Sequence, residues 1–241
     1  MKKLTVLITA AALTAVIITS CSSPKPKDNE LSKKEKEQGY QLLFDGETLN
    51  GWHLYNQGNV SSAWVVQNGE LRCLPGTDAT HGDLVTDQDF ENYEFIFDWK
   101  ISEEGNSGVF INVLERPDIP TAWTSGPEYQ LLEKGHYDYD KEMKRSGCLY
   151  NFSPQLNPVE LKPLSDWNHS VIRQRNGKIE FMLNGVVTAK EDMNSVHWKK
   201  AVANTSFKNF PEFGKHLKGR IALQDWNRGV AFKNIKIRNI N

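Results

Sequence analysis

Short apolar or alternating runs fill the chain from residue 40 onward, and Gly, Asn, Asp and Pro separate them. Alternation with a period of two puts every second side chain on one face, which is typical of strands. No run of sufficient length has the periodicity of a helix. The pattern predicts strands over residues 41–44, 64–67, 70–73, 83–86, 93–101, 108–113, 128–133, 147–152, 168–175, 178–183, 186–191, 219–224 and 230–238.

Asn-Gly pairs separate several of these runs, at Asn68-Gly69, Asn176-Gly177 and Asn184-Gly185. Asn-Gly supplies the positive φ angles of a two-residue hairpin turn. The last two pairs make residues 171–191 a meander of three antiparallel strands. So many short strands indicate two packed antiparallel sheets, and the expected fold is an all-β sandwich or jelly roll.

The N-terminus has the pattern of an export signal. Lys2 and Lys3 precede an apolar run over residues 4–18, and small residues then lead to Cys21. This resembles a bacterial lipoprotein signal, in which residues 1–20 are removed and Cys21 is lipidated. The run is shorter than the roughly 20 residues of a spanning helix, and an uncleaved signal anchor is the alternative.

Residues 21–39 are mostly charged or polar, which predicts a flexible tether between the lipid anchor and a domain over residues 40–241. We therefore expect the protein in the cell envelope, lipid-anchored at the outer membrane or on the periplasmic face. A disulfide is permitted there. For Cys73 and Cys148, however, two buried free thiols are the preferred interpretation.

The net charge of −1 gives no electrostatic footprint for nucleic acid. Aromatic residues make up 10% of the 241 residues and include seven Trp. Trp and Tyr combine an apolar body with a polar group, which suits both cores and sugar-stacking surfaces.

Two strand-like segments carry polar side chains within apolar surroundings. In the first, Asn106, Phe110 and Asn112 are expected to share one side, and in the second Glu128 and Gln130 share one side. Such groups must be solvated, paired or directed at a ligand. Glu128 is the first candidate for acid–base catalysis, and an ordinary surface salt bridge is the alternative.

Other candidates lie at strand ends and in loops. Asp225 could supply a second carboxylate, and Trp226 could supply a surface on which a sugar stacks. The alternative is that Asp225 caps a turn and Trp226 covers the core. His81 is a loop histidine. Asp138, Asp140 and Glu142 alternate in one loop, and without the glycine and terminal Glu of a calcium loop they predict a solvated acidic surface.

Several motifs, in order from residue 40 to residue 240, carry a family resemblance. They are Leu43-Phe44-Asp45-Gly46, Leu49-Asn50-Gly51-Trp52, Asn106-Ser107-Gly108-Val109-Phe110, Glu128-Tyr129-Gln130-Leu131-Leu132, Gly147-Cys148-Leu149-Tyr150, Asp166-Trp167-Asn168, Asn184-Gly185, Gly219-Arg220-Ile221-Ala222-Leu223-Gln224-Asp225 and Val230-Ala231-Phe232-Lys233-Asn234-Ile235-Lys236-Ile237-Arg238. With them the domain resembles the 3-keto-disaccharide hydrolase family over essentially its whole length.

The resemblance implies a concanavalin-like jelly-roll sandwich that cleaves 3-keto-glycosides. A ketone at carbon 3 acidifies the carbon-2 proton, so a base can remove it, the carbon-1 aglycone can leave, and water can add back. A divalent cation could stabilise the enolate, although no ligand cluster demands one. The implied catalytic residues are Glu128 and Asp225, and the implied substrate-binding residues are Trp52, His81, Asn106, Asn112, Gln130, Tyr150, Gln224 and Trp226.

Two departures from the family pattern bear on this function. Members often have His where this chain has Trp226, and Arg or His where it has Asn112. A non-catalytic, carbohydrate-binding surface lipoprotein is therefore one alternative. Direct hydrolysis by two carboxylates is another, but the Glu-x-Asp-x-x-Glu run of sandwich glucanases is absent.

Overall fold

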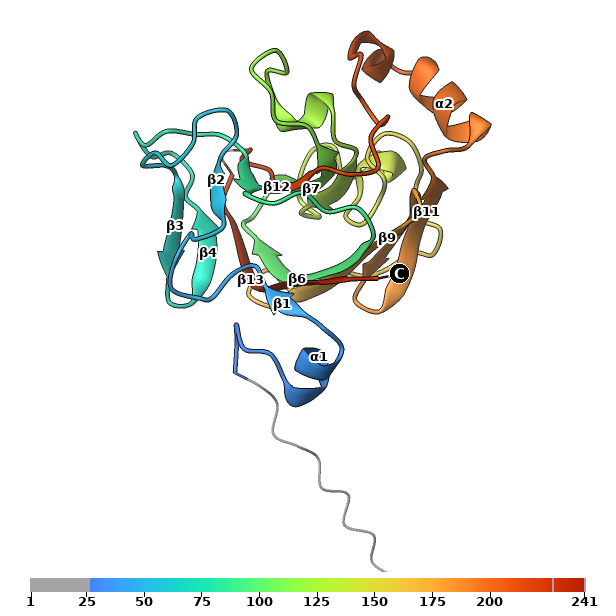
Figure 1. Ribbon diagram of the computed structural model, residues 1–241. Coiled ribbons are helices and arrows are strands. Elements are labelled where there is room, and N and C mark those ends of the chain that lie inside the picture. The colour runs from blue at the N-terminus through green and yellow to red at the C-terminus, as the bar shows by residue number, and fades with distance from the viewer. Residues whose placement is uncertain (1–26, 227, 241) are drawn as a thin grey trace, which may run out of the picture.

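The computed structural model describes residues 27–226 and 228–240 and shows two antiparallel sheets packed face to face (Figure 1). The larger sheet has the order β11-β10-β9-β6-β13-β4-β3, with β1 paired to β13, and the smaller has the order β2-β5-β12-β7-β8. The jelly-roll β-sandwich predicted from the sequence is confirmed. The strands are β1 (Gln41–Leu42), β2 (Trp52–Leu54), β3 (Trp64–Gln67), β4 (Glu70–Cys73), β5 (Leu84–Thr86), β6 (Tyr93–Ile101), β7 (Asn106–Val113), β8 (Glu128–Leu132), β9 (Asn168–Arg175), β10 (Lys178–Leu183), β11 (Val186–Asp192), β12 (Arg220–Leu223) and β13 (Val230–Asn239).

The described residues also contain short helices: α1 (Lys33–Glu37), α2 (Val196–Ala203) and the 3₁₀ turns η1 (Ala122–Thr124), η2 (Glu142–Lys144) and η3 (Ser206–Asn209). The sequence pattern predicted neither β2 nor α2. Conversely, residues 147–152 do not form the predicted strand, and only an isolated bridge joins Leu149 to Tyr129.

Aromatic side chains fill the space between the sheets. Tyr129 of β8 contacts Phe97 and Phe181 of the larger sheet with ring centroids 5.7 and 5.0 Å away. Its hydroxyl lies 2.8 Å from Ser170 Oγ in β9. Because side chains alternate along a strand, burying Tyr129 in this core directs Glu128 to the outer face of the smaller sheet.

A β-bulge interrupts β7 near its end. Arg220 lies opposite Val113 and Ala222 opposite Phe110, so β7 has an extra residue between these pairs. Asn112 adopts a φ of 56°, and its Nδ2 donates to Gln174 Oε1 in the larger sheet at 2.6 Å. The prediction that Asn112 shares a face with Asn106 and Phe110 is therefore wrong, because the bulge turns its side chain inward.

Part of the predicted tether is packed on the domain. The backbone N–H groups of Asn29 and Asn234 each donate to the other residue's side-chain oxygen, at 2.6 and 2.8 Å. Glu35 of α1 forms an ion pair with Lys236 of β13. A free tether over residues 21–39 is thus wrong for residues 27–39, and Figure 1 shows α1 against the larger sheet, on the side away from α2.

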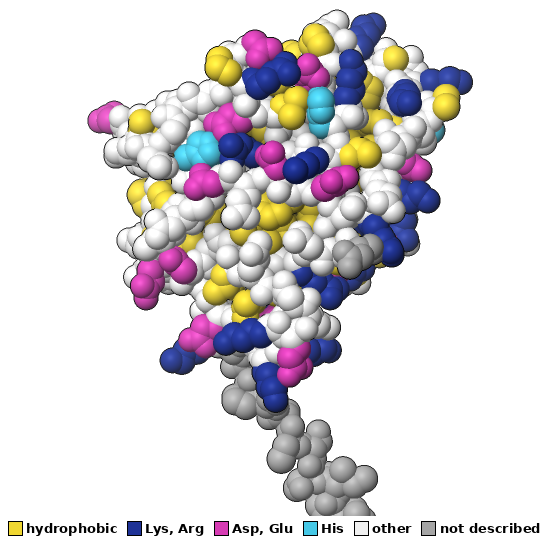
Figure 2. Space-filling view, viewed as in Figure 1, with side chains coloured by type: hydrophobic (Ala, Val, Ile, Leu, Met, Phe, Trp, Pro, Cys, Tyr) yellow, Lys and Arg dark blue, Asp and Glu magenta, His cyan; other side chains and the backbone are white. Residues whose placement is uncertain are grey.

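The predicted signal peptide and Cys21 lie outside the described residues. Within residues 27–226 and 228–240, no helix is long and apolar enough to cross a membrane. Cys73 and Cys148 are buried free thiols, which confirms the preferred interpretation. On the face shown in Figure 2, basic and acidic side chains are interspersed over the upper part of the molecule.

Candidate active site

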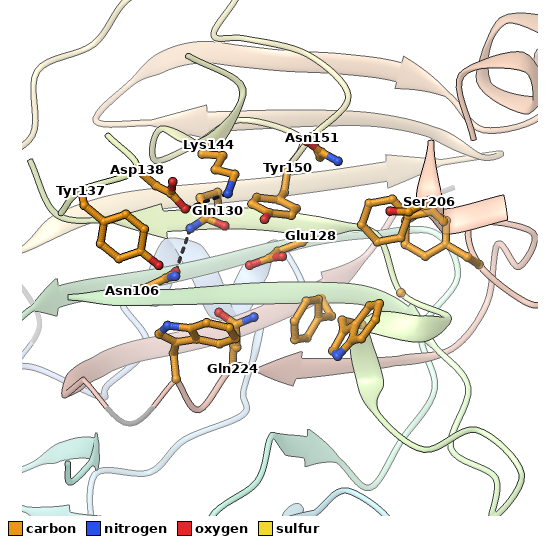
Figure 3. Close-up of a pocket in the computed structure, with 16 residues that line it drawn as sticks. Asn106, Glu128, Gln130, Tyr137, Asp138, Lys144, Tyr150, Asn151, Ser206 and Gln224 are labelled. Carbon is orange, nitrogen blue, oxygen red and sulfur yellow. Dashed lines mark hydrogen bonds and ion pairs between the residues drawn. The ribbon is translucent and has the colours of Figure 1, made fainter. Parts of the chain in front are cut away.

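A cavity of about 400 Å³ lies on the outer face of the smaller sheet, a volume within the range of roughly 300–1,000 Å³ usual for ligand pockets. Strands β7 and β8 form its floor (Figure 3), and segments within residues 123–126, 137–151, 206–213 and 224–226 complete its lining. Its lining residues are Asn106, Phe110, Trp123, Gly126, Glu128, Gln130, Tyr137, Asp138, Lys144, Tyr150, Asn151, Ser206, Phe207, Phe213, Gln224 and Trp226.

Gly108 creates the hollow in the floor. It lies opposite Gln130 in β8, and its carbonyl accepts from the backbone N–H of Gln224 at 2.9 Å. A Cβ added at Gly108 would lie 2.1 Å from Glu128 Oε1. The glycine therefore lets the Glu128 carboxyl group lean over the neighbouring strand.

Three buried side-chain oxygens around Gly108 have no hydrogen-bond partner among the described residues: Glu128 Oε1, Gln130 Oε1 and Gln224 Oε1. Gln130 is held in place by Asn106, whose Oδ1 accepts from Gln130 Nε2 at 2.9 Å (Figure 3). An unmet buried acceptor costs about 1–3 kcal/mol. A ligand with several donors, such as a sugar, would satisfy them, and so would a hard cation that prefers oxygen ligands.

Glu128 is the titratable group of the floor. Its residue is only 8% exposed. Burial raises the pKa of its carboxyl group well above the usual value, the charge of Asp83 raises it further, and the ammonium of Lys144 lowers it. The raised pKa suits a group that exchanges a proton with a substrate near neutral pH.

One wall carries a fixed charge pair. Lys144 Nζ donates to Asp138 Oδ2 at 2.7 Å, and Lys141 binds the other oxygen of the same carboxylate. The acidic loop predicted to be a solvated surface is therefore partly folded into the site. Nothing in the sequence distinguished Lys144 from a surface lysine, because its position depends on how this charged loop folds back over β8.

Aromatic rings surround the mouth of the cavity. Trp123, Tyr137 and Trp226 are 37%, 78% and 53% exposed and come from different loops. The Trp123 ring packs edge-on against Phe210 with centroids 4.7 Å apart. Besides the predicted sugar platform at Trp226, the mouth thus has two aromatic residues that the sequence analysis did not include, Trp123 of η1 and Tyr137.

Several predicted site residues line the cavity together, namely Asn106, Glu128, Gln130, Tyr150, Gln224 and Trp226. Others do not line it. Trp52 is buried in the core between the sheets, and Asn112 pairs with Gln174.

His81 and Asp225 form a separate pair beside the floor. His81 Nδ1 lies 2.6 Å from Asp225 Oδ2, and the Asp225 backbone N–H donates to Asp83 Oδ1 at 3.1 Å. Burial, with a smaller contribution from the charge of Asp225, raises the pKa of Asp83 to about 7. The predicted second carboxylate, Asp225, is therefore not on the cavity surface, because its side chain turns toward His81 and Gly82.

No group of three or more His, Cys, Asp or Glu side chains within the described part of the chain could hold a metal ion. The unpartnered oxygens of Glu128, Gln130 and Gln224 around Gly108 could contact a cation.

The fold and the site together define a jelly-roll sandwich with a cavity on the outer face of its smaller sheet, and the buried carboxyl group of Glu128 at its floor has an oxygen without a hydrogen-bond partner among the described residues. Residues 39–238 match the 3-keto-alpha-glucoside-1,2-lyase-like domain. The chain belongs to this family, which confirms the resemblance found in the sequence.

Relatives cover most of the chain. A 3-keto-disaccharide hydrolase of Bacteroides thetaiotaomicron is 27% identical over 227 residues, which are 83% of this chain and 78% of that protein. A crystal structure of a candidate glycosyl hydrolase from Parabacteroides distasonis superposes with a TM-score of 0.81 and 31% identity, covering 89% of this chain and 100% of the other. A second candidate glycosyl hydrolase from the same organism, 22% identical, has a TM-score of 0.65 over 83% of this chain and 99% of its own, and shows the fold alone.

Proposed function

We propose that this protein cleaves 3-keto-glycosides, with 3-keto-disaccharides as the expected substrate class. Family membership over residues 39–238 and the name of the Bacteroides relative support the substrate. The single structural observation that carries the chemistry is Glu128, a buried carboxyl group with a raised pKa and an unpartnered oxygen at the floor of the cavity.

Glu128 acts as the base. Its carboxylate removes the carbon-2 proton, which the neighbouring ketone acidifies, and the electron pair moves onto the carbon-3 oxygen as an enolate. A base whose pKa is raised toward the working pH accepts such a proton more readily than an ordinary carboxylate. The enolate then restores the ketone, forms a double bond between carbons 1 and 2, and expels the aglycone oxygen. Water adds to carbon 1, and Glu128 returns its proton to carbon 2.

The amides of the floor orient the sugar. The free oxygens of Gln130 and Gln224 accept hydrogen bonds from sugar hydroxyls on either side of Gly108. Asn106 fixes Gln130, so one of these acceptors is in place before the substrate arrives. Acceptors that need no rearrangement hold the carbon-2 proton near the Glu128 carboxylate at little entropic cost.

A carbohydrate-binding protein without catalysis is the second candidate. The aromatic mouth formed by Trp123, Tyr137 and Trp226 favours it, because such rings stack on sugars whether or not a bond is broken. Direct two-carboxylate hydrolysis has less support. Apart from Glu128, the carboxylate lining the cavity is Asp138, and two lysines hold it.

The test is turnover of 3-keto-disaccharides and their unoxidised counterparts by the purified domain, with and without a chelator. We expect sugar release from the 3-keto substrates alone and its loss in Glu128→Gln. Glu47→Gln, at an exposed loop position outside the cavity, is the matched control. Binding of 3-keto substrate without release would favour the non-catalytic protein, and equal turnover of unoxidised substrates would favour direct hydrolysis.

We further propose that lipid on Cys21 anchors the domain in the cell envelope. The pattern of residues 1–21 supports this proposal. Labelling of the expressed full chain with a fatty acid, and its loss in Cys21→Ser, is the direct test.

A further inference from the structure

Tyr150 is the cross-strand neighbour of Glu128. Tyr129 and Leu149 form an antiparallel bridge, and the backbone N–H of Tyr150 donates to the Glu128 carbonyl at 3.0 Å. Residues directly opposite in such a pair point to the same face, with Cβ atoms about 4.5–5.5 Å apart. Both side chains line the cavity, and Figure 3 shows the Tyr150 hydroxyl directed toward the Glu128 carboxyl group.

Lys144 lies over the Tyr150 ring. Its Nζ is 5.7 Å from the ring centroid, and the same ammonium donates to Asp138 Oδ2 at 2.7 Å. Burial lowers the pKa of Lys144, but the hydrogen bond to Asp138 and the electrostatic interactions with Tyr150 and Asp138 outweigh burial and leave that pKa above its usual value. The ammonium therefore stays charged beside the phenol and is fixed in place by Asp138.

Cleavage of a 3-keto-glycoside needs an acid as well as a base. A sugar or alkyl alkoxide is a poor leaving group unless it is protonated as the bond breaks. Asp138 is held by two lysines, and Tyr137 stands at the mouth of the cavity with 78% of its surface exposed. Tyr150 instead lies beside Glu128, the proposed base. The acid and the base must lie close together, because the proton leaves carbon 2 and the aglycone leaves the adjacent carbon 1.

We propose that Tyr150 is the acid that protonates the leaving aglycone and that Lys144 is its positioning residue; this rests on the function proposed above. When the bond between carbon 1 and the aglycone oxygen breaks, that oxygen keeps the electron pair and takes the phenol proton. The phenolate is stabilised by the Lys144 ammonium. In the second half of the reaction, water bonds to carbon 1 through its oxygen and returns a proton to the phenolate.

The test compares two leaving groups on the same 3-keto sugar, 4-nitrophenol and a second sugar. Tyr150→Phe is expected to slow release of the sugar by about 10²–10⁴-fold, the usual contribution of a positioned acid. It is expected to change release of 4-nitrophenol far less, because nitrophenolate leaves without a proton. In deuterated water the variant should still exchange the carbon-2 hydrogen, since Glu128 remains. Tyr139→Phe, which removes a hydroxyl in a neighbouring loop outside the cavity, is the matched control.

Lys144 gives a second readout. Lys144→Met should reproduce the leaving-group dependence of Tyr150→Phe, and Lys144→Arg should restore part of the sugar release. The double variant Lys144→Met with Tyr150→Phe should release the sugar only slightly more slowly than Tyr150→Phe alone. An equal loss on both leaving groups, or loss of carbon-2 exchange in Tyr150→Phe, would overturn the assignment of Tyr150. A wild-type protein that neither exchanges carbon-2 hydrogen nor releases aglycone would overturn the proposed function itself.

Discussion

Two buried glutamates on opposite sides of the sandwich show how environment sets the role of a carboxyl group. Glu94 in β6 and Glu128 in β8 are 3% and 8% exposed. Glu94 accepts from the Tyr40 hydroxyl and pairs with Arg173 and Arg238. Glu128 has an oxygen with no partner among the described residues.

Their pKa values move in opposite directions. Burial raises the pKa of Glu94, but its hydrogen bonds with Tyr40 and Arg173 and the nearby arginine charges outweigh burial and lower it. Burial dominates at Glu128, and its pKa is raised. Two carboxyl groups with little solvent exposure therefore have pKa values shifted in opposite directions, and the hydrogen-bonding and charged partners of Glu94 account for the lowered value there.

Glu128→Gln should have the largest effect on function. We expect kcat/KM to fall by about 10²–10⁴-fold, since the amide cannot accept the carbon-2 proton. Stability should stay the same or rise at neutral pH, because the variant no longer buries an ionisable group that lacks a partner. Urea unfolding at pH 7 beside the kinetics checks both. A variant that loses stability by several kcal/mol would mean that Glu128 is structural, like Glu94.

Glu94→Gln should do the reverse. We expect a loss of about 2–3 kcal/mol in the free energy of unfolding, below the 3–5 kcal/mol of a fully buried pair, because the arginine side chains are partly exposed. Folding lowers the pKa of Glu94, so its stabilisation is present above the unfolded value and is lost as the pH falls through the folded one. The difference in the free energy of unfolding between wild type and variant should therefore disappear in acid. A difference that stays unchanged down to pH 3 would mean that the ionised carboxylate of Glu94 is not its cause.

Much of the fold was predictable from local pattern. The bounds of β6, β9 and β10 agree with the sequence prediction, because period-two alternation and the turn at Asn176-Gly177 define them within a few residues. Helix α2 was not predictable in the same way. It is eight residues long, begins at the Ser195 cap and buries only Trp198, so it carries almost no amphipathic signal.

The part of the candidate site that lies on strands was predictable from alternation. Tyr150, Gln224 and Trp226 lie outside the strands and were identified from a predicted strand end and the family resemblance. Glu128 and Gln130 point to the cavity because Tyr129 between them must be buried, and that alternation is visible in the sequence. The bulge at Asn112 depends on the length of the partner strand, and the position of Lys144 depends on how its loop folds. Neither leaves a local pattern, so neither could be predicted from the chain alone.

Asp83→Asn should change both the stability of the fold and the pKa of Glu128. Burial and the charge of Asp225 raise the pKa of Asp83 to about 7, so the native state binds the proton more tightly than the unfolded chain. The stabilisation is complete below the unfolded pKa of about 3.9 and is lost as the pH rises through the folded value. A shift of about three pKa units is worth about 4 kcal/mol, so we expect the variant to be more stable than wild type by about that amount at pH 8 and equal to it at pH 3.

The same change should lower the pKa of Glu128, because the charge of Asp83 contributes to raising it. The rise of kcat/KM with pH should therefore begin at a lower pH in Asp83→Asn. Thermal unfolding and a pH–rate profile measure the two effects. A variant less stable than wild type at pH 8 would contradict a raised pKa of the Asp83 carboxyl group.

Asn112→Ala should cost stability and leave the chemistry alone. Asn112 and Gln174 exchange two hydrogen bonds between the sheets, at 2.6 and 3.0 Å, and their loss should destabilise the fold by about 1–2 kcal/mol. Its side chain lies outside the cavity, so kcat and KM should hold at temperatures where the variant is folded. A change in KM alone would return Asn112 to the site.

Trp226→Ala should give the smallest effect, confined to binding. The ring is half exposed at the cavity mouth, so it can stack on the sugar in the ground state and the transition state equally. Loss of one such contact is worth about 1 kcal/mol, which raises KM roughly 5-fold with kcat unchanged. Trp226→Phe keeps a ring and should recover most of the affinity. A fall in kcat at constant KM would contradict uniform binding and would place the indole, together with the proposed base Glu128, among the groups that contact the reacting bonds.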